Sequence, residues 1–465
     1  MLAAKPQLVW RQVALALAGV AALLLGPQLR PTPPVAHGFA KLHVKLVGAA
    51  ASSTFLAGDA AAHRAPDLGS AIRERALRGI GWMAFPLFWQ LPPGTRDDRA
   101  RWRELEVSAE HAERMLAALR ADPDVEEAFV RPETALASMR PTAGDDSCPI
   151  ATPSFESYQG YLGPAPHGID APAAWRLGAR GQGVWFADVE GNWNPAHEDL
   201  PGDRVRHAGG SLIEDPSWRA HGTAVLGEVV GRDNGRGVVG IAPDVERVFT
   251  SSIGGTSVAN AIDVAARQLR PGDVLLVELQ SSGPIGRWIP VEYWTDSFDA
   301  IRAATSRGVI VIEAAGNGAE DLDRAVYRRA FDRSHRDSGA IMVGAGGPPR
   351  DGFRDRERLD FSNHGGRVDV QGWGRKVATL DYGDLQACAG IDRHYTGEFG
   401  GTSSASPIVA GAAILLEGIA RQRGRVLPPL ELRDLLHRTG TPQAGNTREP
   451  IGPRPDLSRA LRELR

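Results

Sequence analysis

Short apolar runs alternate with helical segments along most of this chain, from about residue 168 onward. Apolar runs without polar alternation are typical of parallel strands that helices cover on both faces. Such runs occur at 183–188, 274–279, 309–314, 340–344 and 368–370, and segments with helical spacing occur at 258–269 and 297–306. The pattern therefore predicts an α/β fold with three layers and a mostly parallel central sheet. We expect functional side chains at the C-terminal ends of its strands.

Residues 41–140 have a different pattern, which predicts a small α+β domain. Strand-like runs occur at 42–47, 82–88 and 125–130. Ser108 is a suitable N-cap for a helix over 109–120, in which apolar residues recur at helical spacing. Pro123 would stop that helix.

A mixed, polar segment follows this small domain. Residues 135–157 contain scattered Pro, Gly and Asp, which predicts an exposed linker that a protease could cut. We place this linker, as a candidate cleavage site, at 141–160 and the main domain at 161–465.

The N-terminus has the pattern of an export signal. Lys5 and Arg11 flank an apolar run at 13–26, which has signal-peptide length and is short for a membrane span. Gly38 and Ala40 supply small residues at the cleavage-defining positions, so residues 1–40 are predicted to be removed. The alternative is an uncleaved N-terminal anchor, the one case in which a membrane would be a partner. With either a cleaved signal peptide or an uncleaved anchor, the sequence predicts a secreted or cell-envelope protein.

Composition and charge limit the classes of partner and metal site that this chain is expected to have. The 465-residue chain has a net charge of -3 and no block of Lys or Arg, which argues against nucleic acid as its main partner. The two cysteines, Cys148 and Cys388, permit one disulfide in an exported protein or remain two unpaired thiols. Neither has a His or Cys at metal-ligand spacing, so no structural zinc site is expected.

The segment 401–407, Gly-Thr-Ser-Ser-Ala-Ser-Pro, indicates a nucleophile. Ser403 follows a Gly-Thr turn and precedes small and apolar residues, as an exposed serine at the start of a buried helix requires. A serine hydroxyl needs a nearby base, and that base needs an orienting group. This segment therefore predicts a histidine and a carboxylate elsewhere in the chain.

The 401–407 string resembles the nucleophile segment of the subtilisin-like serine proteases. His221 opens His-Gly-Thr-Ala-Val-Leu-Gly and is expected at the N-terminus of a helix. Together with Gly-Ile-Ala-Pro at 240–243, this string resembles the family's base segment. Asp188 ends a buried strand and resembles the family's aspartate. The order Asp, His, Ser is the order of this family. The chain departs from the family at this aspartate segment, because Val189 and Glu190 separate Asp188 from the next glycine.

The resemblance also implies an oxyanion site and a substrate pocket. Asn317 ends the string Ala-Ala-Gly-Asn and would donate to the oxyanion together with the backbone N–H of Ser403. The pocket would be lined by Glu278, Ser281, Ala315 and Gly316. Glu278 is unusual there, and it either selects basic or polar substrates or belongs to a carboxyl pair or salt bridge that involves Glu313.

The predicted chemistry needs no cofactor, and the sequence assigns no metal ligands. Proteases of this family often carry calcium, so structural calcium is expected as an option without an assigned site. Glu320, Asp321 and Asp323 cluster after Asn317, but they lack the spacing of a calcium loop.

The sequence thus predicts a secreted serine endopeptidase made as a zymogen. It would hydrolyse protein or peptide substrates through an acyl-enzyme. The phrase at 121–130 resembles the end of the family's propeptide domains, which implies that residues 41–140 inhibit the enzyme until cleavage. The alternatives are a serine-carboxyl peptidase of acidic pH, which lacks a catalytic histidine, and a silent binding protein on the same fold.

Overall fold

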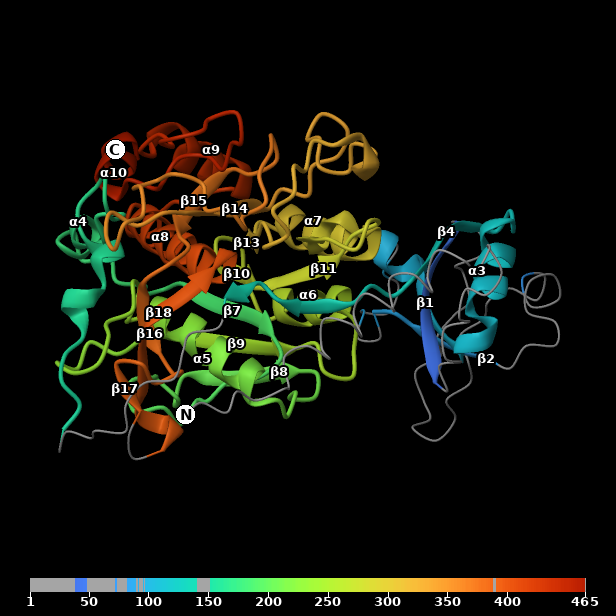
Figure 1. The fold of residues 1–465 in the computed structure, drawn as a ribbon, viewed down its shortest axis with the longest axis horizontal. Helices are drawn as coiled ribbons and strands as arrows, with labels where there is room; N and C mark the ends of the chain where they lie inside the picture. Colours follow the sequence, from blue (N-terminus) through green and yellow to red (C-terminus); the bar gives the residue numbers. More distant parts are fainter. Residues whose placement is uncertain are drawn as a thin grey trace, which may run out of the picture.

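The computed structural model describes residues 38–47, 72, 82–88, 91, 95, 97–139, 151–387 and 390–464. Figure 1 shows a small N-terminal body beside a larger α/β body. The predicted export segment, except its last residues, and both cysteines lie outside the described residues.

The larger body is built on a seven-stranded sheet with the order β15-β14-β13-β10-β7-β9-β8. All of its neighbouring strands pair in parallel, as the sequence pattern predicts. The strands are β7 (Trp185–Glu190), β8 (Val205–Gly209), β9 (Arg247–Ser252), β10 (Val274–Val277), β13 (Ile310–Ala314), β14 (Ile341–Gly346) and β15 (Val370–Trp373).

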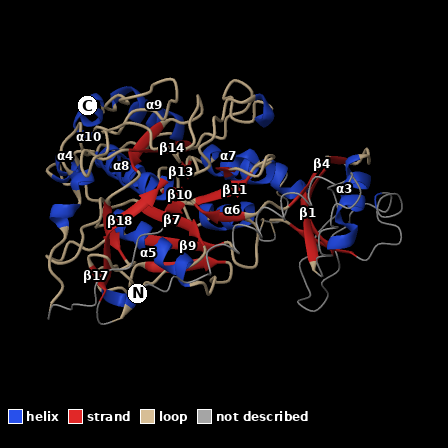
Figure 2. Ribbon diagram, viewed as in Figure 1, coloured by secondary structure: helices blue, strands red, loops and turns tan. Residues whose placement is uncertain are grey.

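Helices cover both faces of this sheet, which makes the three predicted layers (Figure 2). One face packs against α5 (Pro216–Val230) and α8 (Thr402–Gln422), and the other against α6 (Val258–Ala266) and α7 (Thr295–Ser306). Successive side chains of a strand point to opposite faces. Phe186 and Leu276 therefore join the core on the α5 and α8 side, while Ala187 and Leu275 join the other core.

Helix α8 is the central helix of its layer. It is long and apolar enough to cross a membrane, but its whole apolar stretch is buried inside the protein. Around it pack α4 (Ala171–Trp175) and α10 (Leu457–Glu463), and α10 also contacts α9 (Pro429–Thr439). We therefore interpret α8 as a core helix.

The N-terminal body is a four-stranded antiparallel sheet with the order β2-β3-β1-β4. Its elements are β1 (Phe39–Leu46), β2 (Trp82–Pro86), β3 (Trp102–Ser108), α3 (Ala112–Arg120) and β4 (Val125–Val130). One face of the sheet forms a small core with α3, including Leu42, Leu105 and Met115. The opposite face places Trp102 and Phe129 in the core of α6 and α7. Strand β3 was not predicted from the sequence.

Two smaller sheets complete the larger body. Strand β11 (Leu279–Ser282) pairs with β12 (Trp288–Pro290) and β5 (Thr134–Leu136). Strand β18 (His394–Gly401) pairs with β16 (Val377–Leu380), β17 (Gln386–Ala387) and β6 (Ser138–Met139). Short 3-10 turns occur at Asp98–Arg101, Ala109–His111, Glu156–Tyr158, Gly160–Leu162, Val291–Tyr293, Ala325–Tyr327 and Ile391–Arg393.

Residues 134–139 thus add a strand to each of these sheets. The prediction of an exposed linker is wrong for 135–139, because this backbone pairs with the edges of β11 and β18. Unpaired strand edges offer rows of backbone donors and acceptors, and an extended segment satisfies them.

Candidate active site

Ser403 lies in the first turn of α8, as the sequence predicts. The chain enters the helix through Gly401, whose φ of 109° is a conformation that favours glycine. Free backbone N–H groups of a helix start face the site. The N–H of Ser403 donates to the carbonyl of Ala137 at 3.0 Å.

His221 lies on α5 and is fully buried. Its Nδ1 is 2.6 Å from Glu190 Oε2, while its Nε2 and the Ser403 Oγ have no hydrogen-bond partner among the described residues. The sequence analysis placed His221 at the N-terminus of its helix, which is wrong. Asp215 caps α5 through the N–H of Ser217, and Pro216 begins the helix. His221 is therefore in the second turn.

The close approach of α5 to the loop after β7 depends on Gly222. A Cβ at this position would lie 2.3 Å from the carbonyl oxygen of Asn192. The absence of a side chain therefore lets the helix bring His221 against Glu190. This is the physical reason for a glycine directly after the histidine.

The carboxylate that contacts His221 is Glu190, and the prediction that Asp188 orients the imidazole is not what the geometry shows. Asp188 Oδ2 accepts from Trp193 Nε1 at 2.7 Å. Residues 188 and 190 face the same side of β7, and Glu190 is one pleat closer to the C-terminal end of the strand. Its position and longer side chain bring it to His221.

Four buried carboxyl groups lie beneath the serine and the histidine: Asp188, Glu190, Glu228 and Glu278. Glu228 is two turns after His221 on the same face of α5. The N–H of Glu278 lies 3.5 Å from the carbonyl of Val189, between the two β7 carboxyls. Both oxygens of Glu228 and of Glu278 lack hydrogen-bond partners within the described parts of the chain.

Burial raises the pKa of all four carboxyls well above the ordinary range. The charges of Glu190 and Asp188 raise the pKa of Glu278 further, and the nearby hydroxyls of Ser406 and Ser403 oppose this rise. Buried like charges cannot all ionise without large cost. The four groups therefore do not all carry a charge at the same time.

The same burial lowers the pKa of His221 to about 3, and the charge of Asp188 opposes this effect. A neutral imidazole can accept a proton from a serine. His221 therefore stays in the form that a general base requires over a wide pH range while the site is closed.

Asn317 follows β13 and lies next to the start of α8. Its Oδ1 accepts from the N–H of Thr402 at 3.0 Å and from the Thr402 hydroxyl at 3.1 Å. Because Oδ1 is occupied in this way, the amide orientation is fixed. Asn317 Nδ2 is buried and has no partner among the described residues, so it remains a donor.

The segment 134–139 passes directly over these groups. Strand β5 pairs antiparallel with β11, and β6 pairs with Gly400 and Gly401 at the end of β18. Between the two strands lies Ala137, which is buried and whose carbonyl meets the Ser403 N–H. The peptide bond after Ala137 is therefore the one presented to Ser403.

Three of the four predicted pocket residues lie near the bound segment or the start of α8, and Glu278 lies apart from them. Ser281 pairs with Thr134 of the bound segment. Ala315 accepts from Asn363 Nδ2 at 2.6 Å, and the Gly316 N–H donates to the Thr402 hydroxyl at 3.2 Å. Glu278 does not join them, because its carboxyl lies with the buried carboxyls beside Ser403 and Ser406.

Gln280 and Asn363 contact the site but were not predicted. Gln280 Nε2 donates to the carbonyl of Leu136 at 2.7 Å, and Gln280 Oε1 accepts from the Asn317 N–H at 2.8 Å. Asn363 Oδ1 accepts from the N–H groups of Gly318 and Glu320. Gln280 belongs to no sequence pattern that marks it as a site residue, whereas Asn363 lies in the string Ser-Asn-His-Gly at 362–365, which resembles a loop of the family near the site.

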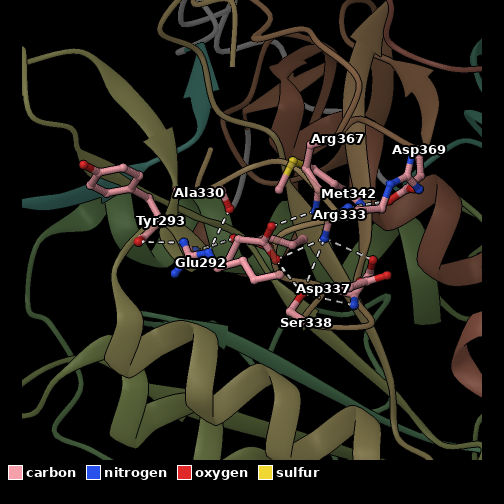
Figure 3. Close-up of polar contacts among 12 residues, drawn as sticks. Glu292, Tyr293, Ala330, Arg333, Asp337, Ser338, Met342, Arg367 and Asp369 are labelled. Atoms are coloured by element: carbon pink, nitrogen blue, oxygen red, sulfur yellow. Dashed lines mark hydrogen bonds and ion pairs between the residues drawn. The ribbon is translucent and has the colours of Figure 1, made fainter. Parts of the chain in front are cut away.

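Glu313 lies on the opposite face of the sheet from Glu278, so the two do not form a pair. Its Oε1 accepts from the Glu292 N–H at 2.9 Å. Figure 3 shows the neighbouring network, in which Arg367 joins Glu292 at 2.7 Å and Asp369 at 2.6 Å. This cluster fits the structural role that the sequence analysis allowed for Glu313.

The acidic residues after Asn317 bond to protein groups. Glu320 accepts from Arg324 and from the Tyr327 hydroxyl, both at 2.7 Å, and Asp323 accepts from the Gly366 N–H at 2.8 Å. Within the described residues, no three His, Cys, Asp or Glu side chains are placed to hold one metal ion.

A serine at a buried helix start, a histidine–carboxylate pair and an amide donor on a three-layer α/β fold define the class of serine peptidases. The model of the subtilase family matches residues 195–452, more than half of the chain, and the chain belongs to that family. It is a serine-type endopeptidase. The match begins after β7, so it does not include Asp188 or Glu190.

Relatives of known activity agree with this assignment. The major intracellular serine protease of Bacillus subtilis (strain 168) is 24% identical over 267 residues, which cover 54% of this chain and 73% of the relative. Subtilisin BL of Lederbergia lenta is 28% identical over 279 residues, which cover 59% of this chain and 89% of the relative.

The fold also has a counterpart among solved structures. The crystal structure of fervidolysin from Fervidobacterium pennivorans, a keratinolytic enzyme related to subtilisin, superposes with a TM-score of 0.59 at 17% identity. The match covers 93% of this chain and 62% of that chain. At this identity it shows the fold alone.

Proposed function

We propose that this chain is the zymogen of an exported endopeptidase that first cuts its own bond between Ala137 and Ser138. The observation that carries the proposal is the 3.0 Å hydrogen bond from the Ser403 N–H to the Ala137 carbonyl. Strand pairing on both sides holds the segment in an extended form across the site. The proposed maturation site lies just before the 141–160 linker that the sequence suggested.

In the proposed reaction, Ser403 Oγ attacks the carbonyl carbon of Ala137 while His221 Nε2 takes the hydroxyl proton. Glu190 holds the imidazole and stabilises its charged form. The oxyanion accepts from the Ser403 N–H and Asn317 Nδ2. The C–N bond then breaks, and His221 returns the proton to the Ser138 nitrogen. Water hydrolyses the acyl-enzyme by the same steps, and no cofactor enters the reaction.

Protein and peptide substrates would then occupy the same strand edges in later turnovers. Before that, the N-terminal body would inhibit the enzyme by keeping 134–137 in place. Ion pairs support this role, because Lys45 lies 2.9 Å from Asp299 and Arg99 pairs with Asp263 across the interface between the two bodies.

A Glu acts directly on the serine in the serine-carboxyl alternative, and Glu278 does lie beside Ser403. The histidine–glutamate pair nevertheless disfavours that alternative. Here Glu190 bonds to the imidazole, and His221 carries the free nitrogen that a base needs. The family does not decide the location of the protein, because it includes an intracellular relative. Export is therefore proposed from the apolar run at 13–26.

Self-cleavage is tested by expressing the full chain and determining the N-terminus of the large fragment. We expect it to begin at Ser138. Ser403→Ala should remain a single chain, and it should lose labelling by a fluorophosphonate probe. Ser404→Ala is the matched control, because the Ser404 hydroxyl bonds to the Trp373 carbonyl instead of the site, and this variant should still be cleaved. Cleavage of the Ser403→Ala chain at the same bond would disprove the proposal.

A further inference from the structure

The side chain of Gln280 connects the bound segment to the oxyanion site. It projects from β11, the strand that pairs with residues 134–136. Its Nε2 donates to the Leu136 carbonyl at 2.7 Å, and its Oε1 accepts from the Asn317 N–H at 2.8 Å. Both ends of one amide are therefore used, one on the substrate side and one on the enzyme side.

The chemistry of the partners fixes this orientation. A carbonyl oxygen can only accept, and a backbone N–H can only donate. Rotating the Gln280 amide by half a turn would place two acceptors together at Leu136 and two donors together at Asn317. Gln280 is largely buried, so water does not replace either bond cheaply.

The contacts continue from Gln280 to the reacting bond. Asn317 is held at its backbone by Gln280, and its Oδ1 accepts from the N–H of Thr402, the neighbour of Ser403. Both donors to the oxyanion, Asn317 Nδ2 and the Ser403 N–H, thus belong to one hydrogen-bonded chain. That chain begins at the carbonyl of the residue before the scissile residue.

We propose that Gln280 is a substrate-positioning residue that recognises this carbonyl and holds Asn317 in place. The substrate class is an acylated amino acid or peptide, because an ester without that carbonyl offers Gln280 nothing to bind. This inference rests on the proposed function of Ser403 and the cleft.

The test compares two substrates on the processed enzyme from the full chain. p-Nitrophenyl N-acetyl-alaninate carries an acetyl carbonyl in the place of the Leu136 carbonyl, and p-nitrophenyl propionate lacks it. Fluorophosphonate titration counts the active sites of each preparation. Gln280→Glu keeps the acceptor for Asn317 and loses the donor, whereas Gln280→Met loses both.

We expect Gln280→Glu at neutral pH to lower kcat/KM for the acetyl-alanine ester by about 5- to 30-fold, the cost of one unmade buried hydrogen bond. Its rate on the propionate ester should stay within about twofold, since the Asn317 bond survives. Gln280→Met should lower the rate on both esters. Acidification should restore the Glu variant, because a protonated carboxyl can donate again.

An unchanged ratio of the two substrates in both variants would overturn the role of Gln280. Equal losses by the two variants on both esters would also overturn it, because that result indicates a structural effect. Failure of the proposed function is a different outcome: the wild-type chain would then hydrolyse neither ester and would not label.

Discussion

Two carboxyl groups on one strand lie near one imidazole. Asp188 and Glu190 are two residues apart on β7, so both face α5. The sequence resemblance favoured Asp188, but the 2.6 Å contact to His221 Nδ1 comes from Glu190. Which of the two orients His221 is a question that single variants answer.

We expect Glu190→Gln to lower kcat by about 10³- to 10⁴-fold, the size of effect known when the orienting carboxylate of a triad becomes an amide. The physical reason is loss of the charge that stabilises the imidazolium. Asp188→Asn should cost less than about tenfold, because the new amide oxygen can still accept from Trp193. Steady-state kinetics on the processed enzymes measures both. A larger loss in Asp188→Asn would return the triad role to Asp188.

At the scale of elements, the alternation of side chains along strands explains the cluster of carboxyls. Asp188 and Glu190 on β7, and Glu278 directly after β10, all point to the layer of α5 and α8. Glu228 meets them from α5. Among the described residues, the imidazole of His221 is the one basic group that acts on this cluster, and it acts on Asp188. The helix–sheet interface beneath the site is therefore sensitive to pH.

This cluster predicts that stability declines as the pH rises. The pKa of folded Glu278 is raised above its ordinary value of 4.5 by burial and by Glu190 and Asp188. The contribution of the protonated carboxyl to stability is therefore fully present below a pH of 4.5. That contribution is lost as the pH rises through the folded-state pKa. In the uncleaved Ser403→Ala chain, Glu278→Gln should flatten the decline of the melting temperature between about pH 5 and pH 9.

The matched control for this measurement is Glu156→Gln, since Glu156 is exposed. That variant should follow the pH dependence of the parent chain. Parallel declines for the parent and Glu278→Gln would show that Glu278 carries no buried proton.

Regular elements were predictable from the sequence where local pattern and tertiary packing agree. Five of the seven parallel strands, α8 with Ser403 in its first turn, and β4 at Val125–Val130 were predicted from the sequence, whereas β8 and β9 were not. Asp215 before Pro216 also signals the true start of α5 in the sequence. The prediction placed the start at His221 instead, because it relied on the histidine motif.

The rest depends on contacts between distant segments, which a local pattern does not contain. Strand β5 forms because it pairs with the open edge of β11, which lies more than 140 residues further along the chain. The sequence of β5 alone has the pattern of a linker. Glu190 reaches His221 because of the offset between β7 and α5. Gln280 acquires its role only when Leu136 and Asn317 meet around it.

At the scale of the whole molecule, two bodies are joined by residues 134–139 and by an interface that has both apolar and polar contacts. The N-terminal sheet presents one face to α6 and α7, where Phe129 lies 4.8 Å from the Trp294 ring centroid. Lys45 pairs with Asp299, and Trp102 Nε1 donates to the same carboxylate at 3.1 Å. After cleavage at Ala137, this interface and the pairing of β5 with β11 would retain the N-terminal body.

His43 makes this interface dependent on pH. Its Nδ1 lies 2.7 Å from Asp296 of α7, and its Nε2 lies 3.1 Å from Glu104 of β3. Burial by itself lowers the pKa of His43, but Asp296 and Glu104 outweigh burial and raise it above 6.5. Lys41 and Arg131 also face Glu104, and the Phe129 ring packs against the imidazole.

Because the pKa is raised in the joined state, the stabilising charge of His43 is fully present below the ordinary value and is lost as the pH rises through the raised pKa. We therefore expect the cleaved N-terminal body to dissociate faster in mildly alkaline than in mildly acidic solution. The rate at which protease activity appears after self-cleavage measures this release. His43→Gln should release the body rapidly at every pH, whereas His111→Gln, next to α3 on the other face of the small sheet, should keep the parental pH dependence. An unchanged pH dependence in His43→Gln would show that the imidazole does not control the interface, and would leave the Lys45 and Arg99 ion pairs as its polar support.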